Sequence, residues 1–114
     1  MGKAASALTS QQRLLESLKS FIADVKRVCA EKGLVFRAAY LVGSRARGDY
    51  VEESDADVVV VVDDVGKMNR IQRMELFVEV LIPKVDLFVY TTEEWTGHDS
   101  VWITELRGEA VKIG

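Results

Sequence analysis

The sequence contains little of what secreted, irregular or membrane-spanning chains need. It has one proline, one histidine and one cysteine in 114 residues. Because Cys29 has no second cysteine to pair with, it excludes an internal disulfide, and we expect a buried thiol in a reducing cytoplasm. No apolar run is longer than Val58–Val62, far short of the roughly 20 residues that cross a bilayer. No apolar signal segment follows the first residues. We therefore expect a soluble cytoplasmic protein without a membrane association.

The composition is that of one compact domain. Hydrophobic residues make up 48% of the chain and charged residues 29%, which is typical of a globular protein with a core of its own. We expect a single domain over residues 1–114, in which residues 1–8 form a loose terminus. The net charge of -3 argues against a protein that grips a nucleic-acid backbone, since such domains are usually basic.

The pattern of apolar residues predicts an α/β (α+β) fold. Helical spacing indicates two longer helices, one that begins at a Thr9–Gln12 capping box and ends at Gly33, and one over 67–82. The other predicted elements are strands at 34–42, 56–62, 84–90 and 109–113, and short helices at 44–47, 92–95 and 101–107. The run Val58–Val62 has no polar alternation, so its strand should be central and covered on both faces. We expect a small mixed sheet of about four strands, backed by the two longer helices.

Two features of the stretch Gly43–Asp57 carry chemistry. Gly43 and Ser44 join a strand to the start of a helix, where serine is a preferred cap and where backbone N–H groups form a concave nest that suits an anion. Asp55 and Asp57 stand two residues apart at the start of the next strand, so their side chains project from one face. Two carboxylates this close repel each other unless a cation lies between them, and oxygen ligands at a strand mouth suit Mg²⁺. The stretch therefore joins a phosphate turn to a metal pair.

Asp86 is a charged residue within an otherwise apolar strand. Burying its carboxylate without a partner would be costly. Two interpretations remain open from the residues: a structural ion pair with a basic side chain, or a third carboxylate beside Asp55 and Asp57.

Four further side chains have open or unremarkable roles. Arg45 lies next to the turn, where it touches phosphate or simply faces water. Trp95 and Trp102 are seven residues apart and form either an exposed contact face or part of the core. His98 stands in a polar loop and is expected to be solvated.

The combination of Gly-Ser, ten residues and Asp-x-Asp, with a later strand that carries a third aspartate, resembles the minimal nucleotidyltransferases of the DNA polymerase beta superfamily. The resemblance is strong over residues 36–90. The positions that match the family pattern are Gly43, Ser44, Arg47, Asp55, Asp57 and Asp86. The resemblance implies a polymerase beta-like nucleotidyltransferase fold.

The resemblance also implies a substrate, metal ions and residue roles. The substrate would be a nucleoside triphosphate, ATP by family expectation, with two Mg²⁺ ions. Gly43, Ser44 and Arg47 would hold the β and γ phosphates. Asp55 and Asp57 would bind both Mg²⁺ ions, and Asp86 would complete the second metal site and help to deprotonate the attacking hydroxyl. This is the two-metal arrangement for in-line displacement at phosphorus.

Small members of this family act on a separate protein. The resemblance implies an antitoxin that transfers AMP to a hydroxyl, such as that of tyrosine, on a small helical HEPN-type toxin encoded beside it. One alternative is a non-catalytic nucleotide-binding module that neutralises or scaffolds its partner by contact. Transfer to a small molecule, or to nucleic acid within a larger complex, is another. A homo-oligomer and a hetero-oligomer are both compatible with the sequence.

Overall fold

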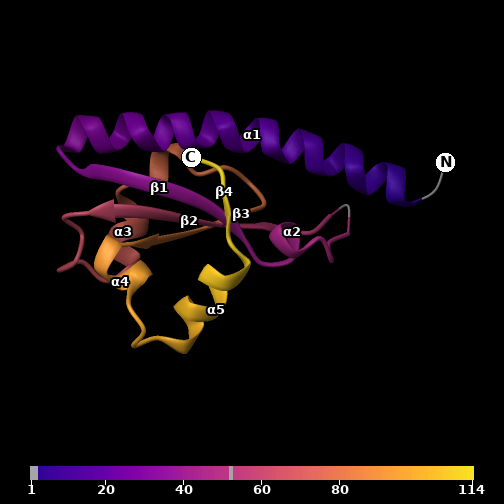
Figure 1. The fold of residues 1–114 in the computed structure, drawn as a ribbon. Helices are drawn as coiled ribbons and strands as arrows, with labels where there is room; N and C mark the ends of the chain where they lie inside the picture. Colours follow the sequence, from indigo (N-terminus) through magenta and orange to yellow (C-terminus); the bar gives the residue numbers. More distant parts are fainter. Residues whose placement is uncertain (1–2, 52) are drawn as a thin grey trace.

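A four-stranded mixed sheet forms the centre of the computed structural model, which describes residues 3–51 and 53–114 (Figure 1). The strands are β1 (Val35–Val42), β2 (Ala56–Asp63), β3 (Val85–Tyr90) and β4 (Val111–Lys112), and their order in the sheet is β3-β2-β1-β4. β1 pairs antiparallel with β2 and β4, whereas β2 and β3 are parallel. The predicted α/β fold with a mixed sheet of about four strands is confirmed.

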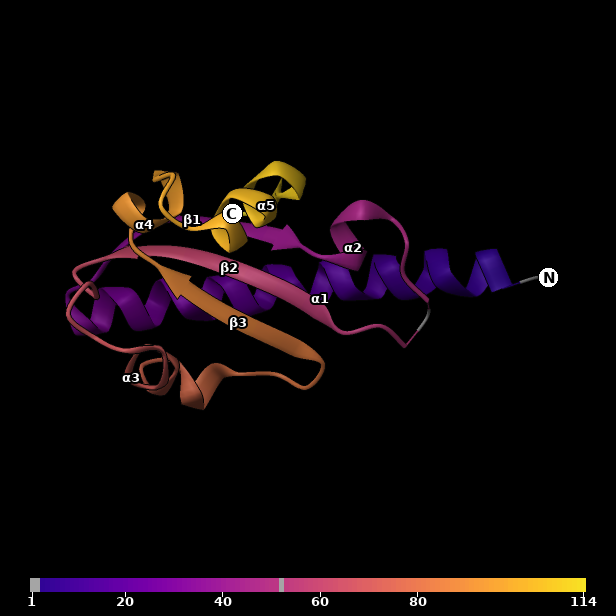
Figure 2. The same cartoon turned by 90° about the horizontal axis from the view of Figure 1, so that it is seen from below.

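Helices cover both faces of this sheet. α1 (Lys3–Lys32) runs along one face, and α4 (Thr92–Thr96) and α5 (Val101–Glu109) lie on the other (Figures 1 and 2). α2 (Ser44–Arg47) follows β1, and α3 (Arg70–Glu75) with the 3₁₀ turn η1 (Val78–Val80) leads from β2 to β3. β2 lies between two strands and its residues 58–62 are all buried. The prediction of a central strand covered on both faces is therefore confirmed.

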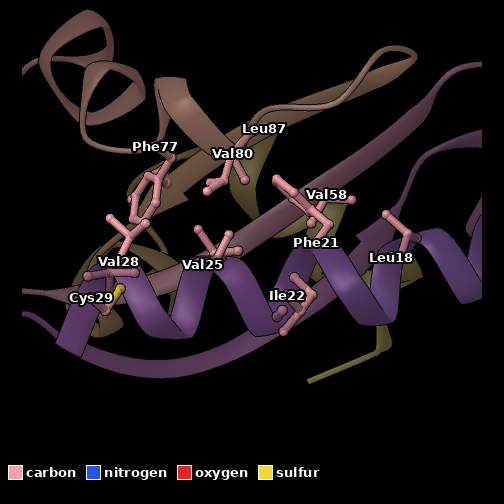
Figure 3. Close-up of a cluster of buried hydrophobic side chains, with 14 of the residues drawn as sticks. Leu18, Phe21, Ile22, Val25, Val28, Cys29, Val58, Phe77, Val80 and Leu87 are labelled. Carbon is pink, nitrogen blue, oxygen red and sulfur yellow. The ribbon is translucent and has the colours of Figure 1, made fainter. Parts of the chain in front are cut away.

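The larger core lies between α1 and the sheet (Figure 3). The buried side chains from α1 are Leu18, Phe21, Ile22, Val25, Val28 and Cys29. They pack on Val58 and Leu87 of the sheet and on Phe77 and Val80 of the segment before β3. Cys29 is a free, buried thiol, as predicted, and burial raises its pKa.

The first helix begins earlier than its sequence signal indicated. α1 starts at Lys3, so Thr9 lies inside the helix and the predicted capping box is not its beginning. Of the expected loose terminus, residues 1 and 2 lie outside the described part of the chain, and residues 3–8 continue the helix. The N-terminal part of α1 extends past the sheet beside α2 (Figures 1 and 2). Within residues 3–51 and 53–114, no helix combines the length and the hydropathy of a membrane span.

The predicted long helix over 67–82 is wrong. The structure has a six-residue α3, which begins with a capping box between Asn69 and Gln72, followed by a separate 3₁₀ turn. Phe77 has φ -114° and ψ 11°, which interrupts helical geometry, and its side chain is completely buried. Ile71 and Val78, which completed the apparent helical pattern, are 69% and 66% exposed. Burial of Phe77 therefore prevailed over the local periodicity, and only one of the two expected longer helices exists.

Candidate active site

Three strand ends meet at one edge of the sheet. Because β1 and β2 are antiparallel, Val42 at the end of β1 pairs with Asp57 at the start of β2. Because β2 and β3 are parallel, Asp57 also pairs with Asp86 at the start of β3. Val58 packs into the core on the α1 side, so by strand alternation Asp57 points to the face that α5 covers. Topology thus brings Gly43, Asp57 and Asp86 together from distant parts of the sequence.

Gly43 has a backbone conformation that favours glycine, and it lies directly against the side chain of Asp57. Its φ of 74° and ψ of -155° fall in a region that is essentially restricted to glycine. A Cβ atom at this position would collide with Oδ2 of Asp57. The carbonyl of Gly43 accepts hydrogen bonds from the N–H groups of Ala46 and Arg47, each at 3.0 Å. Gly43 is the N-cap of α2 and Ser44 its first residue, which places the start of the predicted helix correctly and the cap one residue earlier.

The carboxylates at the sheet edge repel one another. The pKa of Asp57 is raised by burial first, then by the charges of Asp86 and Asp55, by a hydrogen bond with Asp86, and by the charge of Glu109. Asp55 and Asp86 are exposed. The structure thus places Asp86 beside Asp57, which favours the open alternative of a shared carboxylate site.

A divalent cation would suit this arrangement, since it would offset the repulsion that raises the pKa of Asp57. Hard carboxylate oxygens at an open edge are the ligands that Mg²⁺ accepts. Asp57 and Asp86 are adjacent, whereas Asp55 acts on Asp57 through its charge. Within the part of the chain that the structure describes, no three acidic, histidine or cysteine side chains stand at metal-binding spacing. The role of Asp55, Asp57 and Asp86 as joint ligands therefore stays a prediction.

A cleft of about 310 Å³ opens between this edge and α5. One wall consists of Gly43, Ser44, Arg47 and Asp57, and the other of Trp102, Glu105, Leu106 and Glu109. The α5 residues follow a spacing of three, four and seven from the first, so they form a single face of that helix. The cleft therefore joins the predicted phosphate turn to Asp57, one of the three predicted metal residues.

Glu109 is a residue of this cleft that the sequence did not reveal. The N–H group of Gly43 donates to Oε1 of Glu109 at 2.8 Å, and Nη1 of Arg47 donates to Oε2 at 2.9 Å. Bonds to Glu109 and Asp49 raise the pKa of the Arg47 guanidinium. We expected the last helix to stop at Gly108, but it continues to Glu109 and so delivers this carboxylate. Glu109 thus occupies two of the donors that were expected to hold phosphate.

Arg45 has a structural role instead of the two that the sequence left open. Its side chain is 5% exposed. The guanidinium donates to the carbonyl of Ser54 at 3.1 and 3.0 Å, to Gln11 at 3.2 Å and to Ser10 at 3.1 Å. It also lies 4.5 Å from the ring centroid of Tyr50. Arg45 therefore ties α2 to α1 and to the loop that leads to the carboxylates.

The two tryptophans have different environments. Trp95 is 4% exposed and stacks on Tyr40 and Tyr90, with ring centroids 5.1 and 6.3 Å away. Trp102 is 54% exposed and lines the cleft. Core packing is therefore confirmed for Trp95, whereas Trp102 is exposed and its role as a contact face stays a prediction. His98 is exposed, as expected, and its Nδ1 lies 3.4 Å from Arg107.

A glycine turn, adjacent carboxylates and an open cleft at one sheet edge define a candidate site for transfer of a phosphate-bearing group. A sequence profile for the nucleotidyltransferase domain matches residues 22–108, and the chain belongs to this family. The match includes every predicted site residue, from Gly43 to Asp86.

Two relatives agree with this assignment. A crystal structure from Sulfolobus solfataricus, described as that of a "putative nucleotidyltransferase", superimposes with a TM-score of 0.74 at 30% identity, covering 98% of this chain and 89% of that one. A Methanocaldococcus jannaschii protein named "putative protein adenylyltransferase" is 34% identical over 61 residues. That match spans 54% of this chain and 59% of the relative, less than two thirds of its length.

Proposed function

We propose that this protein transfers AMP from ATP to a hydroxyl group on a partner protein. The observation that carries the proposal is the meeting of the Gly43–Ser44 turn with Asp57 in one cleft, with Asp86 paired to Asp57 on the neighbouring strand. Protein as the acceptor is supported by the name of the Methanocaldococcus jannaschii relative. The identity of the partner, a HEPN-type toxin that this antitoxin silences, is supported by the family resemblance of the motif.

The turn side of the cleft holds the triphosphate. The Ser44 hydroxyl, the Gly43 amide and the Arg47 guanidinium donate hydrogen bonds to phosphate oxygens, and charge-assisted bonds of this kind are the stronger ones. Because Glu109 now accepts from Gly43 and Arg47, its carboxylate has to move aside when phosphate enters. Nucleotide binding therefore includes a local exchange of one anion for another.

The carboxylate side of the cleft serves the reaction. Asp55 and Asp57 would hold two Mg²⁺ ions and Asp86 would complete the second site; the ions supply charge neutralisation at the phosphates. The acceptor oxygen forms a bond to the α phosphorus while the bond from that phosphorus to the bridging oxygen of the β phosphate breaks. Pyrophosphate leaves with the bond's electron pair. Asp86, which is exposed, accepts the proton of the acceptor hydroxyl.

The test is incubation with ATP labelled at the α phosphate, Mg²⁺ and the protein encoded by the neighbouring gene. We expect label on the partner with the wild type and none with Asp57→Asn. Asp64→Asn is the matched control, since Asp64 is an exposed aspartate just beyond the other end of β2 and asparagine tolerates its positive φ of 74°. The proposal is contradicted if Asp57→Asn labels the partner as much as the wild type does. It is also contradicted if neither the wild type nor the Asp64→Asn control labels the partner.

An assay of the partner's toxicity, run beside the labelling assay, distinguishes catalysis from neutralisation by contact. If Asp55→Ala, Asp57→Ala still silences the partner completely, the protein acts as a nucleotide-binding module and not as an enzyme. Asp86→Asn should reduce transfer far more than ATP affinity, because Asp86 serves the acceptor and not the triphosphate. Equal loss of both would contradict this division of roles.

A further inference from the structure

The wall of the cleft that α5 provides contains an exposed aromatic side chain. Trp102 lines the same space as Ser44 and Asp57, and 54% of its surface is exposed. Its indole therefore offers an aromatic face to the space beside these polar groups. Trp95, by comparison, is 4% exposed and already has its stacking partners. Trp102 is thus the tryptophan available to a ligand.

The Trp102 ring is supported from the sheet side by one aromatic contact. Phe88 meets it edge to face, with ring centroids 6.3 Å apart and an interplanar angle of 64°. Phe88 lies in β3 two residues after Asp86, so both side chains are on the same face of the sheet. The Phe88 ring is in turn contacted by Arg70, whose guanidinium lies 5.0 Å from the ring centroid. A ring that is held by neighbours before binding loses little conformational freedom when a ligand stacks on it.

The cleft contains groups suited to two parts of a nucleotide. Ser44, Arg47 and Asp57 form one wall, and Trp102 belongs to the opposite wall. Aromatic faces stack on every nucleobase, because each base has a π face of its own. An indole opposite a phosphate turn is therefore suited to the base of the same nucleotide.

We propose that Trp102 is the platform on which the nucleobase stacks while the turn at Gly43 and Ser44 holds the triphosphate. This inference rests on the proposed function, because it places the base of the nucleotide whose phosphates that function uses. It assigns the binding of the base to α5 and leaves its identity to other contacts, since stacking tolerates all four bases.

The experiment measures the binding of ATP and of inorganic tripolyphosphate, both with Mg²⁺, by titration calorimetry. We expect Trp102→Ala to weaken ATP binding about tenfold, within the range that base stacking contributes, and to leave tripolyphosphate binding unchanged. Val101→Ala is the matched control, since Val101 is 76% exposed on the same helix and does not line the cleft. It should bind both ligands as the wild type does.

Tryptophan fluorescence gives an independent readout. ATP should quench the wild type, and this quenching should vanish in Trp102→Phe, where Trp95 is the remaining tryptophan. Wild-type ATP affinity in Trp102→Ala overturns the inference, and if transfer to the partner falls at the same time, Trp102 contacts the partner instead. If the wild type binds neither ATP nor tripolyphosphate, both the proposed function and this inference are overturned.

Discussion

Replacing Gly43 with alanine perturbs the backbone and the carboxylates of the site at the same time. Its φ of 74° and ψ of -155° lie in a region where a side chain costs about 1–3 kcal/mol. The added Cβ would also collide with Oδ2 of Asp57. Because Asp57 pairs with Val42 in a regular antiparallel register, its backbone is fixed, and the carboxylate has to rotate away.

The two effects have different magnitudes. We expect Gly43→Ala to lower the free energy of unfolding by about 2 kcal/mol, the middle of the range for a strained backbone. Activity should fall further, by about 100-fold, because a reacting group displaced by about 1 Å loses that much. Gly33→Ala and Gly48→Ala are matched controls: their φ values are 70° and 90°, and nothing lies within 4 Å of an added Cβ.

The assay combines denaturant unfolding with transfer of labelled AMP, or with Mg²⁺-dependent ATP binding if the partner is not in hand. The two control variants should lose about 1–2 kcal/mol of stability through the left-handed backbone alone and keep the activity of the wild type. A folded Gly43→Ala protein with wild-type activity would refute the reasoning. So would controls that lose activity to the same extent, because strain alone would then explain the loss.

Three further predictions concern single side chains. Glu109→Gln should bind ATP about fivefold more tightly, since it removes one negative charge worth roughly 1 kcal/mol at 4 Å in water; weaker binding in calorimetry would mean that Glu109 positions Arg47 for the nucleotide. Arg45→Met should lose about 2–3 kcal/mol in denaturant unfolding, because the partly buried carbonyl of Ser54 loses both of its bonds to the guanidinium; an unchanged midpoint contradicts the structural role. Because the pKa of Asp57 is raised in the folded protein, the folded protein binds this proton more tightly than the unfolded chain does. The free energy of unfolding of the metal-free protein therefore falls as pH rises from the ordinary carboxyl range through the raised pKa. Asp57→Asn should therefore gain stability relative to the wild type as pH rises in EDTA, and a gain that shrinks would contradict the assignment.

Local patterns were sufficient for the main strands and for the residues of the turn. The unbroken apolar run Val58–Val62 predicted the central strand, and the Gly43–Ser44 pair marked the end of β1. Both follow from short-range chemistry, namely burial on two faces and the conformations that glycine allows. For Asp86 the local pattern left two interpretations open, and only the parallel register of β2 and β3 places it beside Asp57.

Contacts between distant residues were beyond the reach of local patterns. Glu109 bonds to Gly43 across 66 residues, and no motif around Gly108 announces it. The buried state of Arg45 depends on Gln11, 34 residues away. The helix predicted over 67–82 is interrupted at Phe77, whose ring is buried in the core. Tertiary packing commonly overrides periodicity in this way.

The central claim is that the turn at Gly43 and Ser44 and the carboxylates Asp55, Asp57 and Asp86 act as one nucleotide and metal site. A crystal grown with a non-hydrolysable ATP analogue and Mn²⁺ tests it most directly, because Mn²⁺ reveals its positions by anomalous scattering. The account predicts Mn²⁺ between these aspartates and the phosphates, phosphate oxygens on Ser44 and Arg47, and the Glu109 carboxylate moved off the Gly43 amide. A nucleotide bound outside this cleft, or bound in it with no metal at the aspartates, would contradict the account.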